Sequence, residues 1–73
     1  MTNISLGILI ALNEHKTIEG TEELARILGT REGYVKTNAL LLAKYGMIKM
    51  QISAGGRGNK TIYKDAGVIK VQR

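Results

Sequence analysis

The chain begins with an almost uniformly apolar segment, residues 4–12, which predicts a helix over residues 1–15 capped by Thr2 or Asn3. Alternate apolar positions would also fit a strand, but the unbroken apolar run at residues 9–12 breaks a period of two. A surface helix of a small domain needs only one apolar stripe. Because this segment has more apolar residues than one stripe needs, it predicts a helix that lies beneath the others or that meets a second subunit.

A second, short helix is predicted over residues 21–28. Thr21 is suited to be its N-cap, and Gly29 is placed to end it in a left-handed conformation. In the connection before it, Ile18 is suited to a brief edge strand.

A third and longer helix is predicted over residues 30–45. Its inward stripe has helical spacing and consists of Val35, Ala39 and Leu42. Gly33, in the first turn, costs about 1 kcal/mol relative to alanine inside a helix. Two explanations stay open: another molecule approaches the backbone closely there, or the helix end is loose.

After the third helix the apolar period changes to two, which predicts a β-hairpin over residues 47–65. Its first strand places Ile48, Met50 and Ile52 on one face, and a glycine-rich loop leads to the second strand. Residues 66–73 form a β-prone tail. The predicted fold class is therefore α+β, with three helices followed by a hairpin.

Charge is distributed unevenly along what we expect to be a single domain, residues 1–73. The net charge is +5. Residues 1–32 carry five acidic and three basic side chains, whereas residues 33–73 carry eight basic side chains and one acidic. Such asymmetry indicates that one part of the molecule faces a polyanion.

The residue types present also exclude several kinds of site. The chain has no cysteine and a single histidine, His15, so disulfides and thiolate metal sites are absent and we expect no metal or cofactor. Residues 58–61 lack the adjacent Gly-Lys pair and the following helix of a phosphate-binding loop. Because the chain also lacks cysteine and has one histidine, we do not expect an enzyme. No segment has the length of a membrane span or the pattern of a signal peptide, which leads us to expect a cytoplasmic protein.

The order of helix, helix, glycine turn, helix and basic hairpin resembles the winged helix-turn-helix family of DNA-binding domains. Residues 21–29 resemble the family's second helix, with its E-E-L-A-x-x-L-G pattern. Residues 55–63 are similar to a wing of the G-R-G-x-K-x-x-Y kind. The junction of recognition helix and wing is matched by Val35, Ala39, Leu42, Gly46, Met47 and Ile48. The resemblance covers residues 4–65.

The resemblance implies that the third helix enters the major groove of DNA. The residues left outside its buried stripe are Arg31, Glu32, Tyr34, Lys36, Thr37 and Asn38. Arg31 is suited to guanine and Asn38 to adenine. Tyr34 and Thr37 suit a phosphate or a thymine methyl group, and Lys36 a phosphate. The alternative interpretation is a solvated helix face.

In the same way, the wing is expected to follow the minor groove through Arg57, Asn59 and Lys60. Residues 30–34 depart from the serines and threonines usual at the start of the recognition helix, which leaves open that the wing carries more of the binding. The alternative is a hairpin turn with incidental charge.

We therefore expect a homodimer that binds double-stranded DNA, most simply as a sequence-specific transcriptional regulator. The expected dimer contacts are Ile4, Ile8 and Leu12 of the first helix, with Leu40 and Leu41 as further candidates. Two alternatives remain. One is a plasmid-partition, transfer-origin or architectural DNA-binding protein, and the other is a winged-helix module that binds another protein.

Overall fold

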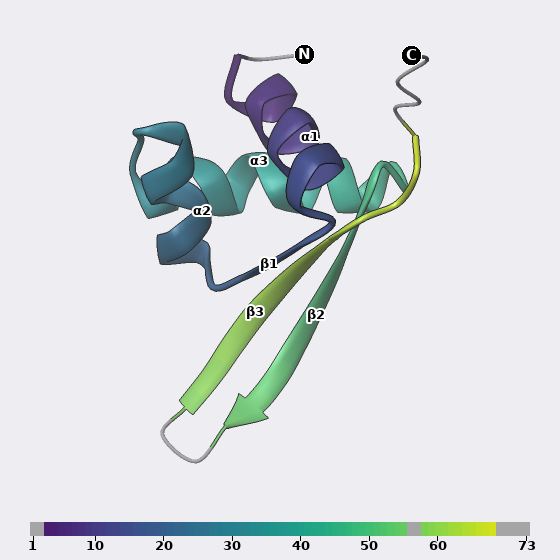
Figure 1. Ribbon diagram of the computed structural model, residues 1–73. Helices are drawn as coiled ribbons and strands as arrows, with labels where there is room; N and C mark the ends of the chain where they lie inside the picture. The colour runs from purple at the N-terminus through teal and green to yellow at the C-terminus, as the bar shows by residue number, and fades with distance from the viewer. Residues whose placement is uncertain (1–2, 56–57, 69–73) are drawn as a thin grey trace.

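The protein is an α+β domain in which three helices accompany a three-stranded antiparallel sheet (Figure 1). The computed structural model describes residues 3–55 and 58–68, so most of the expected tail lies outside the described residues. In chain order the elements are α1 (Asn3–His15), β1 (Thr17–Glu19), α2 (Thr21–Leu28), α3 (Glu32–Lys44), β2 (Ile48–Gly55) and β3 (Gly58–Asp65).

The turn between α2 and α3 explains why α3 starts two residues later than predicted. Gly29 has φ 66° and ψ 36°, the left-handed conformation expected of it. Its N–H donates to the carbonyl of Arg26, and the N–H of Thr30 donates to the carbonyl of Ala25. This pair of hydrogen bonds makes Thr30 part of the end of α2. Arg31 consequently occupies the N-cap position of α3.

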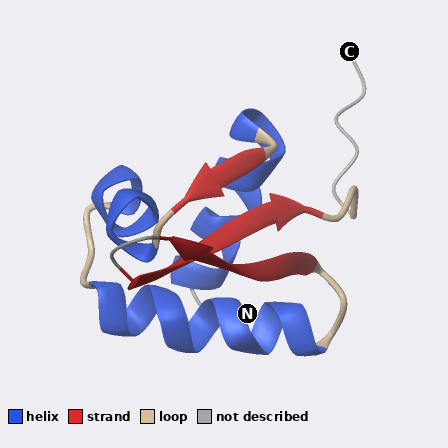
Figure 2. Ribbon diagram, turned by 90° about the horizontal axis from the view of Figure 1, so that it is seen from below, coloured by secondary structure: helices blue, strands red, loops and turns tan. Residues whose placement is uncertain are grey.

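The sheet has the strand order β1-β3-β2, so the edge strand expected at Ile18 is present and pairs with β3 (Figure 2). Strands β2 and β3 form the predicted hairpin, which extends well beyond the helices (Figure 1). Ile48 is buried and Met50 partly buried, but Ile52 is 70% exposed. The predicted apolar face therefore continues past the point where the helices can cover it.

The core lies where the three helices meet the base of the sheet. Ile8 and Leu12 of α1 have no exposed surface and are among its most buried side chains, while Ile4 packs against it partly buried. The expectation that these residues contact a second subunit is therefore wrong for Ile8 and Leu12. Instead, α1 exposes Leu6 and Ile10, at 46% and 48%.

Thr21 does not cap α2 as predicted. It is the first residue of the helix, the N-cap position belongs to Gly20, and no side chain caps this end. The Thr21 hydroxyl instead shares a 2.7 Å hydrogen bond with the hydroxyl of Tyr63, a residue of β3 with no exposed surface. This bond ties the hairpin to the start of α2.

Candidate functional site

The exposed side of α3 carries most of the predicted site residues. Val35, Ala39 and Leu42 are buried, as predicted, which fixes one side of the helix against the core. The opposite side exposes Tyr34, Lys36, Thr37, Leu40, Leu41 and Lys44. Arg31, just before the helix, is exposed as well.

The first turns of α3 form a hollow of about 300 Å³ that brings three predicted residues together. It is lined by Arg31, Gly33, Tyr34 and Thr37. The Thr37 hydroxyl donates a 3.0 Å hydrogen bond to the carbonyl oxygen of Gly33, one turn earlier. This bond engages the hydroxyl with the helix backbone. The methyl group is then the part of the Thr37 side chain that remains for contact with another molecule. The hollow thus combines one cation with an aromatic ring and carbon surface.

Asn38 is not the outward-facing residue that the sequence suggested. It is partly buried, and its Oδ1 accepts a 2.8 Å hydrogen bond from the Ser5 hydroxyl of α1. Its Nδ2 donates at 2.7 Å to the carbonyl oxygen of Tyr34. Bidentate pairing with adenine requires both ends of the amide. Asn38 is therefore better placed to fix α3 against α1 than to contact a ligand.

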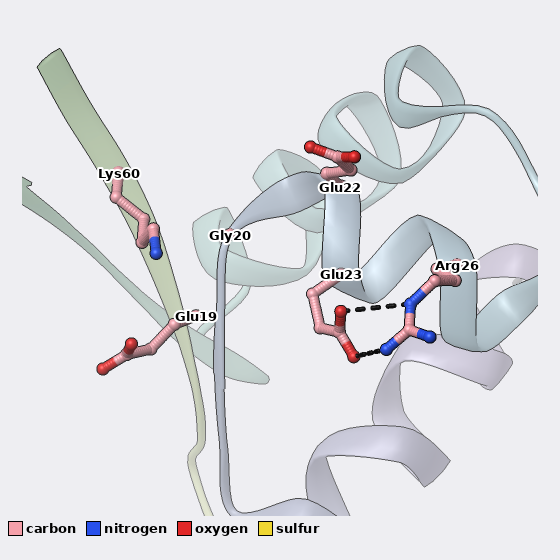
Figure 3. Close-up of a pocket in the computed structure, with 6 residues that line it drawn as sticks. All are labelled: Glu19, Gly20, Glu22, Glu23, Arg26 and Lys60. Carbon is pink, nitrogen blue, oxygen red and sulfur yellow. Dashed lines mark hydrogen bonds and ion pairs between the residues drawn. The ribbon is translucent and has the colours of Figure 1, made fainter. Parts of the chain in front are cut away.

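The hairpin residues are described only in part. Arg57 lies outside the described residues, and of Asn59 only its backbone, in β3, is described. Lys60 is exposed and lines a second hollow, of about 340 Å³, at the side of the sheet (Figure 3). The other residues around this hollow are Glu19, Gly20, Glu22, Glu23 and Arg26.

This second hollow carries three carboxylates against two cations, so it does not gather the positive charge that a phosphate needs. Arg26 Nε donates to Glu23 Oε2 at 3.2 Å, and Arg26 Nη2 pairs with Glu23 Oε1 (Figure 3). These hydrogen bonds hold the pKa of Glu23 below its ordinary value and raise that of Arg26. The glutamates of α2 therefore weaken the expectation that Lys60 contacts DNA.

Two further lysines face each other on the outer side of the sheet. Lys49 of β2 lies directly opposite Lys64 of β3, and both are exposed. Lys64 is also opposite Thr17 of β1, which is exposed too. Like charges directly opposite in a sheet are destabilising. The alternation of buried and exposed residues puts both lysines on the outer side, but only the strand register shows that they are opposite.

Two further features are absent from residues 3–55 and 58–68, a metal-binding group and a membrane-spanning helix. In that part of the chain, no group of three histidine, cysteine, aspartate or glutamate side chains is arranged to hold a metal ion. No helix described there is long and apolar enough to cross a membrane.

Comparison of the chain with protein-family models, with curated proteins and with solved structures finds no match.

Proposed function

We propose that this protein is a winged helix-turn-helix domain that binds double-stranded DNA, with α3 as its recognition helix and β2–β3 as its wing. The observation that carries the proposal is the exposed side of α3, where Arg31, Tyr34 and Thr37 line one hollow and Lys36 is exposed on the same helix. In addition, α2, the Gly29 turn and α3 follow in the order of a helix-turn-helix, and the hairpin projects from the body (Figure 1).

In the proposed complex, α3 lies in the major groove with its N-terminal half against the base edges. Arg31 donates to the O6 and N7 of a guanine, the commonest specific contact in that groove. Lys36 neutralises a phosphate on the flank of the groove. Asn38 holds α3 in place through Ser5 and reads no base.

The outer side of the sheet supplies the second contact with the DNA backbone. Lys49 and Lys64 form the closest pair of cations that the described strand register places on the hairpin. A neighbouring phosphate would relieve the repulsion between them, because it attracts both. Phosphate contacts of this kind position the protein without reading sequence.

We further propose a two-fold dimer, with Leu6 and Ile10 of α1 in its interface. Residues 3–13 contain no charged side chain, so α1 is a surface on which two copies of a basic chain meet without repulsion. Leu40 and Leu41 are also about half exposed, but they share the exposed side of α3 that the DNA would cover. Two-fold symmetry favours an inverted-repeat site with half-sites about 10–10.5 base pairs apart.

Selection from a random duplex pool at about 150 mM salt, followed by sequencing, tests this proposal. We expect an enriched inverted repeat, and Arg31→Ala should relax one base position per half-site by about 1–3 kcal/mol. Asn38→Ala is the contrasting variant: it should lower stability without relaxing a single base position. Retention without enrichment, lost as salt rises, would indicate an architectural DNA-binding protein.

The second candidate function is a protein-interaction module. It is favoured by exposed apolar side chains on α3, at its C-cap and on the hairpin, namely Leu40, Leu41, Tyr45 and Ile52. On this alternative the basic residues are incidental, and no duplex would be retained in the selection experiment at about 150 mM salt.

A further inference from the structure

Gly33 is a glycine that nothing within the described chain requires. A Cβ built at this position has no heavy atom within 4 Å outside its own helix backbone and chain neighbours. Its φ is not in the left-handed region, unlike that of Gly29. Gly7 of α1 shows the contrast, because a Cβ there would lie 3.0 Å from Leu28 Cδ2 of α2. Packing explains Gly7, and no contact within the described residues explains Gly33.

The missing side chain lies in the wall of the hollow on α3. Arg31, Tyr34 and Thr37 line the hollow together with Gly33, and the Thr37 hydroxyl donates to the Gly33 carbonyl. The four lining residues therefore offer a bare Cα at Gly33, a methyl group at Thr37 and an aromatic ring at Tyr34, with Arg31 as the cation among them. A Cβ at this position would project into open space, with no side-chain atom of Arg31 or Thr37 within 4 Å of it.

We propose that this hollow receives the C5-methyl group of a thymine, next to the base pair whose guanine is bound by Arg31. The thymine methyl is the apolar feature of the major groove, and proteins contact it with small carbon groups such as a threonine methyl. A bare Gly33 lets the base edge come closer to the helix than any other residue would allow. The inference rests on the proposed function, because it specifies which bases α3 distinguishes.

A phosphate is a poorer occupant of the same hollow. The hydrogen of the Thr37 hydroxyl is already donated to the Gly33 carbonyl, so that group has no donor left for a phosphate oxygen. The methyl group of Thr37, by contrast, takes no part in this hydrogen bond and can make an apolar contact. One cation beside a largely carbon wall matches the edge of a T–G or G–T step, which offers a methyl group beside two acceptors.

The test replaces each thymine of the selected duplex in turn by deoxyuridine, which removes only the methyl group, and measures the Kd of the full chain. For the wild type we expect about a four-fold loss at one thymine per half-site, the effect of burying one methyl group at about 0.8 kcal/mol. Gly33→Ala should bind the thymine duplex more weakly and lose the deoxyuridine effect. Its thermal unfolding midpoint should not fall, which separates this loss from misfolding.

Two substitutions at Thr37 provide a matched control. Thr37→Ser keeps the hydroxyl and removes the methyl group, so it should abolish the deoxyuridine effect. Thr37→Val keeps the methyl group and removes the hydroxyl, so it should retain that effect. If Thr37→Ser responds to deoxyuridine as strongly as the wild type does, the thymine inference is wrong while specific DNA binding stands. The same holds if the wild type does not respond to deoxyuridine. If no duplex binds at all, the proposed function fails as well.

Discussion

The hydrogen bond between Thr21 and Tyr63 permits a quantitative test of how the hairpin is attached to the helices. The sequence suggests that the Thr21 hydroxyl caps α2, whereas in the structure it pairs with the Tyr63 hydroxyl at 2.7 Å. The two roles predict different energetics for the same substitution. Thr21→Val removes the hydroxyl and keeps the shape of the side chain.

The magnitude follows from burial. Tyr63 has no exposed surface, so Thr21→Val leaves its hydroxyl buried without this partner, at about 1–3 kcal/mol. Tyr63→Phe removes the other hydroxyl and should cost about 0.5–1.5 kcal/mol, since Thr21 is only partly buried. Once Tyr63 is phenylalanine, Thr21→Val should cost little. We therefore expect a coupling energy of about 1–3 kcal/mol between the two positions.

The assay is urea unfolding of the wild type, both single variants and the double variant, with thermal unfolding as a second measurement. In a domain of this size, 1 kcal/mol shifts Tm by about 4–8 °C. Thr21→Ser retains the hydroxyl and is the control that should lie close to the wild type. A capping role instead predicts that Thr21→Val costs about 1 kcal/mol whichever residue occupies position 63. A coupling energy near zero would refute the reasoning from the structure.

Three further predictions follow from single features of the fold. Lys16 has φ 66°, a left-handed conformation that glycine adopts without strain, so Lys16→Gly should raise the free energy of unfolding by about 1 kcal/mol, as measured in urea. The ion pair that this variant loses offsets little of the gain, because it is long, at 3.7 Å to the partly buried Asp65, and its Lys16 end is exposed. Ile10→Lys should give a monomer by size-exclusion chromatography with light scattering while the fold persists, whereas Ile8→Ala should destabilise the fold by about 2–5 kcal/mol. Lys49→Gln and Lys64→Gln should each reduce the slope of log K against log salt for DNA binding by about 0.9, and unchanged slopes would remove these lysines from the interface.

Local sequence signals located the helices and the hairpin well, because their causes are local. The second helix has the predicted bounds, 21–28, since Gly29 can end it without help from the rest of the fold. The predicted start of α3, at Thr30, is too early because the N–H of Thr30 donates to the carbonyl of Ala25 and so belongs to the end of α2. That bond depends on the turn geometry, which the residue types alone do not reveal.

The candidate site was harder to predict where it depends on contacts between distant segments. The hydrogen bond that ties Asn38 to α1 comes from Ser5, which is 33 positions away. The first helix posed a similar problem. It is apolar on all sides, so no amphipathic period distinguishes the buried Ile8 from the exposed Ile10.

The positions that we propose to contact DNA are also positions where the residue type lowers the stability of the free protein, with no contact among the described residues to account for it. Gly33 costs about 1 kcal/mol relative to alanine, and the facing lysines at positions 49 and 64 repel each other. A 73-residue domain has only about 4–11 kcal/mol of stability in total, so these costs are a substantial fraction. A ligand that binds only the folded state offsets them by mass action. Gly33→Ala and Lys64→Gln should therefore each stabilise the free protein and weaken its binding to the selected duplex. Without DNA, the midpoint of thermal unfolding of each variant should be higher than that of the wild type. The increase in this midpoint on adding DNA should be smaller than for the wild type. Variants that gain stability and keep full affinity would show that these positions are exposed surface with no role in binding.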